Sequence, residues 1–148
     1  MTIVYVDADA CPVKEEVYKV AARHGATVKV VANSFLAVPR DPAIERVIVP
    51  GGLDVADDWI AERAGPGDVV VTADVPLADR CVKAGAVALS PTGKVFDEAS
   101  IGMARAVRDL MSDLREAGAV TGGPKPFSAR DRSAFLQTLD RELRRAGR

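Results

Sequence analysis

The sequence predicts an α/β fold built on a mainly parallel, five-stranded sheet. Short runs rich in β-branched and apolar residues alternate with helical stretches along the chain, which is typical of βαβ units. The run at residues 69–72 is apolar on both faces, as a central parallel strand should be. Turns rich in Gly and Pro separate these runs, without a repeat or a second-domain boundary. We therefore expect residues 1–148 to form one domain.

The individual elements follow from these patterns and from the residues that end them. Strands are expected at about residues 2–7, 27–32, 44–49, 69–72 and 86–89. Helices are expected at about residues 12–24, 55–64, 75–84, 98–117 and 129–146. Pro12 suits a first helical turn, Gly25 suits a helix end, and Asp54 suits the N-cap of the second helix. Ser128 and Asp131 predict a capping box at the start of the last helix.

Composition and charge narrow the class of protein. No apolar run approaches the ~20 residues that a membrane-spanning helix needs, and no signal peptide is visible. Cys11 and Cys81 make neither a disulfide framework nor a zinc site, which favours a reducing cytoplasm. Residues 1–100 carry ten Lys/Arg and fifteen Asp/Glu, whereas residues 101–148 carry ten and six. This asymmetry permits an acidic metal site beside a basic surface for a polyanion, although the charge alone favours a solvated basic helix.

Two aspartates close the first predicted strand. Asp7 ends the strand, Asp9 follows two residues later, and a helix begins at once. Ligands of open α/β sheets bind outside the carboxyl ends of the strands, and the helix N-terminus there suits a phosphate. Two such carboxylates repel each other unless a cation offsets their charge. We therefore expect Asp7 and Asp9 to hold a cation, the alternative being that Asp9 caps the helix and Asp7 only ends the strand.

The same arrangement recurs further along the chain. Asp74 ends the fourth predicted strand just before a helix, and it faces Asp7 if the first and fourth strands are neighbours. Asp79 lies one helical turn later, where a surface role is as reasonable as a ligand role. In the second helix Asp57 and Asp58 point about 100° apart, so at most one of them reaches the site. Adjacent acids in a first turn also complement the helix dipole, which is the alternative for this pair.

Carboxylates without competent His or Cys partners favour hard cations, which means Mg²⁺ or Mn²⁺ rather than Zn²⁺. Such an ion activates a water and stabilises charge on a phosphodiester, so that hydrolysis needs no protein nucleophile. His24 is the only histidine, and neither a Ser-His-Asp nor a Cys-His set can be assembled. Candidate substrate contacts are polar residues at the same edge of the sheet and cations near the C-terminal Gly/Pro linker, namely Lys14, Asn33, Ser34, Lys125, Arg130 and Arg132.

Several motifs follow one another through nearly the whole chain. They are Asp7-Ala-Asp-Ala-Cys-Pro-Val-Lys14, Val31-Ala-Asn33, Asp54-Val-Ala-Asp57, Gly67-Asp-Val-Val-Val-Thr-Ala-Asp-Val-Pro-Leu-Ala78, and Thr121-Gly-Gly-Pro with Asp131-Arg132 and Phe135. Together they resemble the bacterial YaiI/YqxD family, which is similar to PIN-like nuclease domains. The resemblance implies a doubly wound sheet with helices on both faces, in a PIN-like, Rossmann-like three-layer architecture. It also implies catalytic and metal-binding roles for Asp7, Asp9, Asp57 and Asp74, with Asp79 as a further metal ligand.

One turn departs from the family pattern. Residues 90–93 read Ser-Pro-Thr-Gly, where Asn-Pro-Arg-Gly is expected, so this turn supplies no arginine to the site. The function expected from the residues and the resemblance together is a divalent-metal-dependent nuclease. It would act in the cytoplasm on RNA or another single-stranded nucleic acid, with RNA favoured over DNA.

Two alternatives remain open. A non-catalytic nucleic-acid-binding or regulatory module would use the basic tail, through Lys125, Arg130 and Arg132. A haloacid-dehalogenase-type phosphatase would use Asp7 as the nucleophile and Asp9 as the acid/base. Cys11, which stands where that phosphatase motif has Thr or Val, counts against the second alternative.

Overall fold

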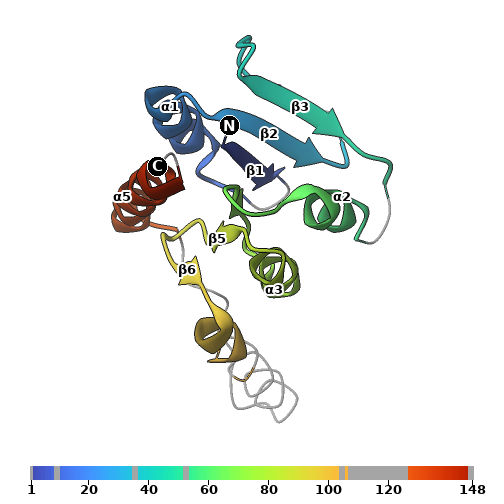
Figure 1. Ribbon diagram of the computed structural model, residues 1–148. Coiled ribbons are helices and arrows are strands. Elements are labelled where there is room, and N and C mark those ends of the chain that lie inside the picture. The colour runs from blue at the N-terminus through green and yellow to red at the C-terminus, as the bar shows by residue number, and fades with distance from the viewer. Residues whose placement is uncertain are drawn as a thin grey trace.

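The strands form one mixed sheet with the order β3-β2-β1-β4-β5-β6 (Figure 1). The structure is a computed structural model that describes residues 2–8, 11–34, 37–51, 54–103, 106 and 127–146. The first five strands are parallel to their neighbours, and the sixth is antiparallel to the fifth. Their bounds are β1 Ile3–Asp7, β2 Thr27–Ala32, β3 Ile44–Ile48, β4 Val69–Val71, β5 Val87–Leu89 and β6 Val95–Phe96.

Helices cover both faces of this sheet. Their bounds are α1 Lys14–His24, α2 Val55–Arg63, α3 Val75–Lys83 and α5 Ala129–Ala146, and residues 98–103 and 106 are also helical. Figure 1 shows α1 and α5 on one side of the sheet and α2 and α3 on the other. The strands alternate accordingly, since Val4 and Val6 pack with Phe135 of α5, whereas Tyr5 packs with Ile60 of α2. The sheet is therefore the middle of three layers.

The predicted strands are present to within one residue at each end, but the predicted count of five is wrong. The sixth strand, β6, follows the expected turn at residues 90–93, where the Gly93 amide donates to the Ser90 carbonyl at 3.0 Å. Its two residues are too few to show any alternation in the sequence. The condition under which Asp74 would face Asp7, that the first and fourth strands are neighbours, is met by the parallel pairing of β1 with β4.

Most predicted helix ends are confirmed. Gly25 has φ 66° and its amide caps α1, and Ser128 and Asp131 exchange two capping hydrogen bonds of 3.0 and 3.2 Å. One expectation is wrong in detail, because helix α1 begins at Lys14, after the turn that contains Pro12. Asp54 is the N-cap residue of α2, as expected, but it has φ 63° and makes no capping hydrogen bond with its side chain.

Parts of the C-terminal prediction lie outside the described residues. The helix expected over 98–117 is described only at 98–103 and 106, and the linker expected at 121–127 only at Phe127. Phe127 packs against the α1/α5 side of the core. Among the helices that the structure describes, none has the length and apolarity needed to cross a membrane.

Candidate functional site

Asp7 lies at the carboxyl end of β1, where it contacts the end of β4. Val6 is in register with Val71, so the next residues, Asp7 and Thr72, also meet. The Thr72 hydroxyl donates to Oδ2 of Asp7 at 2.9 Å, and both side chains are buried. A buried carboxylate needs such a donor, because burial without one costs several kcal/mol. The fold therefore fixes the Asp7 side chain at the centre of the sheet edge.

Thr72 is a residue that sequence reasoning missed. Besides donating to Asp7, its hydroxyl oxygen accepts a hydrogen bond of 3.0 Å from the Asp74 amide. It therefore links the strand end that carries Asp7 to the turn that carries Asp74. The only available signal was a hydroxyl residue after the apolar run of β4, which reads equally well as an ordinary strand residue.

Asp74 begins α3 at the same edge of the sheet. Its Oδ1 accepts a hydrogen bond of 3.0 Å from the Leu77 amide, which makes Asp74 the N-cap of this helix. Pro76 follows inside the first turn, where its missing amide hydrogen costs nothing. The side chain of Asp74 thus has a structural role as well as the predicted site role, and it lies next to Asp7 through Thr72.

Asp57 comes to this edge from α2, and its electrostatics reflect the neighbouring carboxylates. The pKa of Asp57 is raised to about 6, first by burial and then by the charges of Asp74, Asp7 and Asp54 and a hydrogen bond with Asp74. Asp58, the next residue, points away and pairs with Arg80 of α3 at 2.7 Å. Of the two adjacent acids, Asp57 is therefore the one that joins Asp7 and Asp74.

The chemistry of these donors suits a hard cation, but the described residues do not form a complete metal site. Carboxylate oxygens are the ligands that Mg²⁺ and Mn²⁺ prefer. Within the part of the chain that the structure describes, no group of three or more His, Cys, Asp or Glu side chains is arranged to hold a metal ion. Asp9, the fourth expected carboxylate, lies outside the described residues.

Two of the other expected site residues, Asp79 and Lys14, have polar partners of their own. Asp79 forms an ion pair of 3.0 Å with Lys83 on α3 and is not among the charges that raise the pKa of Asp57. Lys14 donates to the Cys11 carbonyl at 2.9 Å, close to the start of α1. Asn33 and Ser34 are exposed after β2 at the same edge of the sheet.

The basic tail is only partly described. Arg130 is exposed at the start of α5. Arg132 donates to the Pro12 carbonyl and to Glu16, both at 3.0 Å, so its guanidinium already has protein partners. Lys125 lies outside the described residues.

Both cysteines are buried and free. Burial raises the pKa of Cys11, and burial raises the pKa of Cys81 to about 11. The thiol form therefore dominates near neutral pH, and neither side chain is an activated nucleophile. Cys11 is therefore a small packed residue.

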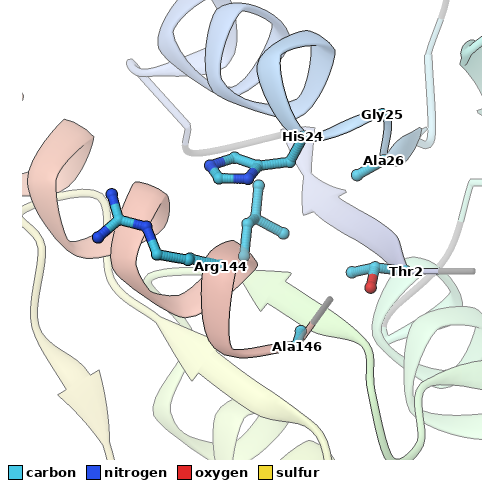
Figure 2. Close-up of a pocket in the computed structure, with 7 residues that line it drawn as sticks. Thr2, His24, Gly25, Ala26, Arg144 and Ala146 are labelled. Carbon is cyan, nitrogen blue, oxygen red and sulfur yellow. The ribbon is translucent and has the colours of Figure 1, made fainter. Parts of the chain in front are cut away.

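A pocket of about 510 Å³ lies at the opposite end of the strands from the aspartates (Figure 2). Its lining residues come from the segments that precede β1 and β2 and from the end of α5, and they are Thr2, His24, Gly25, Ala26, Leu143, Arg144 and Ala146. Figure 2 shows the His24 ring from α1 near the Arg144 side chain from α5. None of the expected site residues lines this pocket, so we locate the candidate site from the carboxylates at the other edge.

The fold and the acidic edge define an α/β protein with one mostly parallel six-stranded sheet and three carboxylates, on Asp7, Asp57 and Asp74, at its carboxyl edge. The chain belongs to the YaiI/YqxD family, because residues 5–145 match the family model described as "Uncharacterized BCR, YaiI/YqxD family". This confirms the family resemblance that the sequence motifs indicate.

Close relatives carry the name UPF0178 protein. One from Rhodopseudomonas palustris (strain BisB18) is 69% identical over 147 residues, which cover 99% of this chain and 95% of the relative. UPF0178 protein bll3966 from Bradyrhizobium diazoefficiens is 65% identical over 99% of this chain and 88% of its own length. A relative from Nitrobacter winogradskyi is 62% identical over 97% and 92%, respectively. No solved structure matches the chain significantly.

Proposed function

We propose that this protein is a divalent-metal-dependent nuclease of the PIN-like, doubly wound type that hydrolyses phosphodiester bonds in RNA. The observation that supports this most is the meeting of Asp7, Asp57 and Asp74, from three different elements, at the carboxyl edge of the sheet. Strand β1 lies beside both β2 and β4, so the chain crosses over in opposite directions on its two sides. In α/β proteins this is the position where ligands bind.

The charge of the cluster is the physical argument for a cation. Three neighbouring carboxylates repel one another, and this repulsion adds to burial in raising the pKa of Asp57 to about 6. A divalent cation would offset the same repulsion without a proton. Asp7, Asp57 and Asp74 are the described candidates for holding Mg²⁺ or Mn²⁺, although their side chains are not arranged as a metal site in the described residues, and Asp9 is the fourth candidate from the sequence.

The chain's own residues have separate tasks in this proposal. Mg²⁺ or Mn²⁺, when bound, supplies an activated water and a counter-charge for the phosphate. The Thr72 hydroxyl orients the carboxylate of Asp7, and the Leu77 amide orients that of Asp74. Helix α1 starts at this edge, where its N-terminal amides favour a substrate phosphate. The two free, buried cysteines suit a reducing cytoplasm as the place of action.

A cleavage assay with matched variants tests the proposal. Labelled single-stranded RNA and DNA are incubated with wild type, Asp57→Asn and Asp58→Asn in Mn²⁺, Mg²⁺ or EDTA. We expect metal-dependent cleavage of RNA that Asp57→Asn lowers at least tenfold. Asp58→Asn removes the same charge one position away, from a side chain that pairs with Arg80, and should leave cleavage unchanged.

Other outcomes point to the alternatives. Absence of cleavage with every metal, together with RNA binding that Asp57→Asn leaves intact, would reject the nuclease and favour the binding module. A metal-dependent phosphoaspartate on Asp7, formed from a small phosphomonoester, would favour the phosphatase. Cleavage that both variants lower equally would show that Asp57 has no particular role.

A further inference from the structure

Two cationic side chains hold the turn between β1 and α1. The Lys14 ammonium donates to the carbonyl of Cys11 at 2.9 Å, and the Arg132 guanidinium donates to the carbonyl of Pro12 at 3.0 Å. These are consecutive carbonyls of the turn that leads from Asp7 into α1. Lys14 is a local contact, whereas Arg132 comes from α5, 120 residues along the chain from Pro12. The turn is therefore tied to the C-terminal helix.

Arg132 also offsets the negative charge of Glu16 at the start of α1. Its Nη1 lies 3.0 Å from Oε1 of Glu16, and its guanidinium lies over the Phe127 ring, 4.9 Å from the ring centroid. The Glu16 side chain is only 17% exposed, and its other oxygen, Oε2, is buried without a hydrogen-bond partner in the described residues. Glu16 is thus a largely buried carboxylate whose ion pair with Arg132 offsets its charge.

Polar side chains link α1 and α5 at two places, one near each end of α1. The Arg132 contacts lie at the edge that carries Asp7, and the second junction lies near the opposite edge. There Oδ1 of Asp140 lies 2.7 Å from Nε2 of His24 and 3.5 Å from Nη1 of Arg23. The second junction joins the same two helices without touching the turn, so it serves as an internal control.

We propose that Arg132 is a positioning residue for the candidate site. From α5 it holds Pro12 and Glu16, and it thereby keeps the N-terminus of α1 in place beside the end of β1. It also neutralises Glu16, whose charge would otherwise oppose a substrate phosphate at this helix end. This role replaces the direct substrate contact expected from the sequence, and its consequence for catalysis rests on the proposed nuclease function.

Hydrogen exchange on the full chain tests the positioning role without requiring activity. Exchange of the amides from residue 11 to residue 17 is compared in wild type, Arg132→Ala, Arg132→Lys and Asp140→Asn, beside the Tm of each. We expect Arg132→Ala to speed this exchange about tenfold, since it removes a charge-assisted hydrogen bond from a partly exposed side chain. Arg132→Lys should recover part of the protection. Asp140→Asn should lower the Tm while leaving exchange in this segment unchanged.

The outcomes separate this inference from the proposed function. Unchanged exchange in Arg132→Ala, or an equal increase in Asp140→Asn, would overturn the positioning role. With RNA and Mn²⁺, cleavage should fall about tenfold in Arg132→Ala and recover partly in Arg132→Lys. If wild type does not cleave at all, the nuclease proposal fails, and the exchange experiment still decides whether Arg132 holds the turn.

Discussion

Asp57→Asn should stabilise the metal-free protein at neutral and alkaline pH. In the folded protein the pKa of Asp57 is raised from its usual value of 3.8 to about 6. Folding therefore favours the protonated form of Asp57. The contribution of this residue to the free energy of unfolding is fully present below pH 4, decreases as the pH rises towards about 6 and stays lost above it. Asn removes the titrating group and the repulsion from Asp74 and Asp7. The gain should consequently be near zero at pH 4 and largest above pH 7.

The size of the effect follows from the pKa. A rise from 3.8 to about 6 corresponds to at most about 3 kcal/mol in the free energy of unfolding. The Asp57 side chain is partly exposed, so solvent screening reduces this to about 1 kcal/mol. For a chain of 148 residues, such a gain raises the Tm by about 3 °C.

Thermal unfolding in EDTA at pH 4, 6 and 8 measures this dependence, with Asp58→Asn as the matched control. Asp58 pairs with the exposed Arg80, so Asp58→Asn should be neutral or slightly destabilising at pH 8. A gain in Asp57→Asn that does not vary with pH would refute the reasoning, because no titration would then be involved. A loss of stability at pH 8 would show that Asp57 is held by attractive contacts and not by its repelling neighbours.

Two further substitutions test the contacts that support the site. Thr72→Val keeps the shape of the side chain but removes the hydroxyl that donates to buried Asp7, so chemical denaturation should show a loss of about 1–3 kcal/mol. Gly93→Ala should cost more than Gly25→Ala in the same measurement, although φ is positive at both positions. A Cβ at Gly93 would come within 2.7 Å of the Ala134 backbone, whereas at Gly25 it meets nothing within 4 Å. Equal losses of stability would mean that the α5 backbone moves to make room for the Cβ at Gly93.

The strands were predictable because each is a β-branched run bounded by a turn. The apolar run of β4 is recognisable as a strand from the sequence alone. Gly25 and Gly85 have the positive φ expected of residues that follow helices. Strand β6 was missed because two residues carry no periodic signal, and its pairing with β5 comes from the turn before it. The sequence also could not show that Asp54, at the N-cap of α2, has φ 63° and makes no capping hydrogen bond with its side chain.

Of the candidate site, the sequence could place only the residues that directly follow a predicted strand. Asp7 and Asp74 follow their strands directly, so their shared edge follows from parallel pairing. The choice between Asp57 and Asp58 depends on how α2 is rotated against the sheet, which two adjacent acids do not reveal. The contact of Arg132 with Glu16 could not be predicted, because the two residues lie 116 residues apart in the sequence.

Two of the three carboxylates at the sheet edge, those of Asp7 and Asp74, are oriented by hydrogen bonds that asparagine can also accept. Asp7 accepts a hydrogen bond from the Thr72 hydroxyl, and Asp74 accepts one from the Leu77 amide. An amide oxygen accepts the same hydrogen bonds as a carboxylate oxygen, and Asn is as good an N-cap as Asp. Asn at either position therefore removes charge while keeping the donor contacts. A loss of metal binding or of cleavage in these variants would consequently report the missing charge, whereas alanine would mix that effect with a loosened strand end or an uncapped helix.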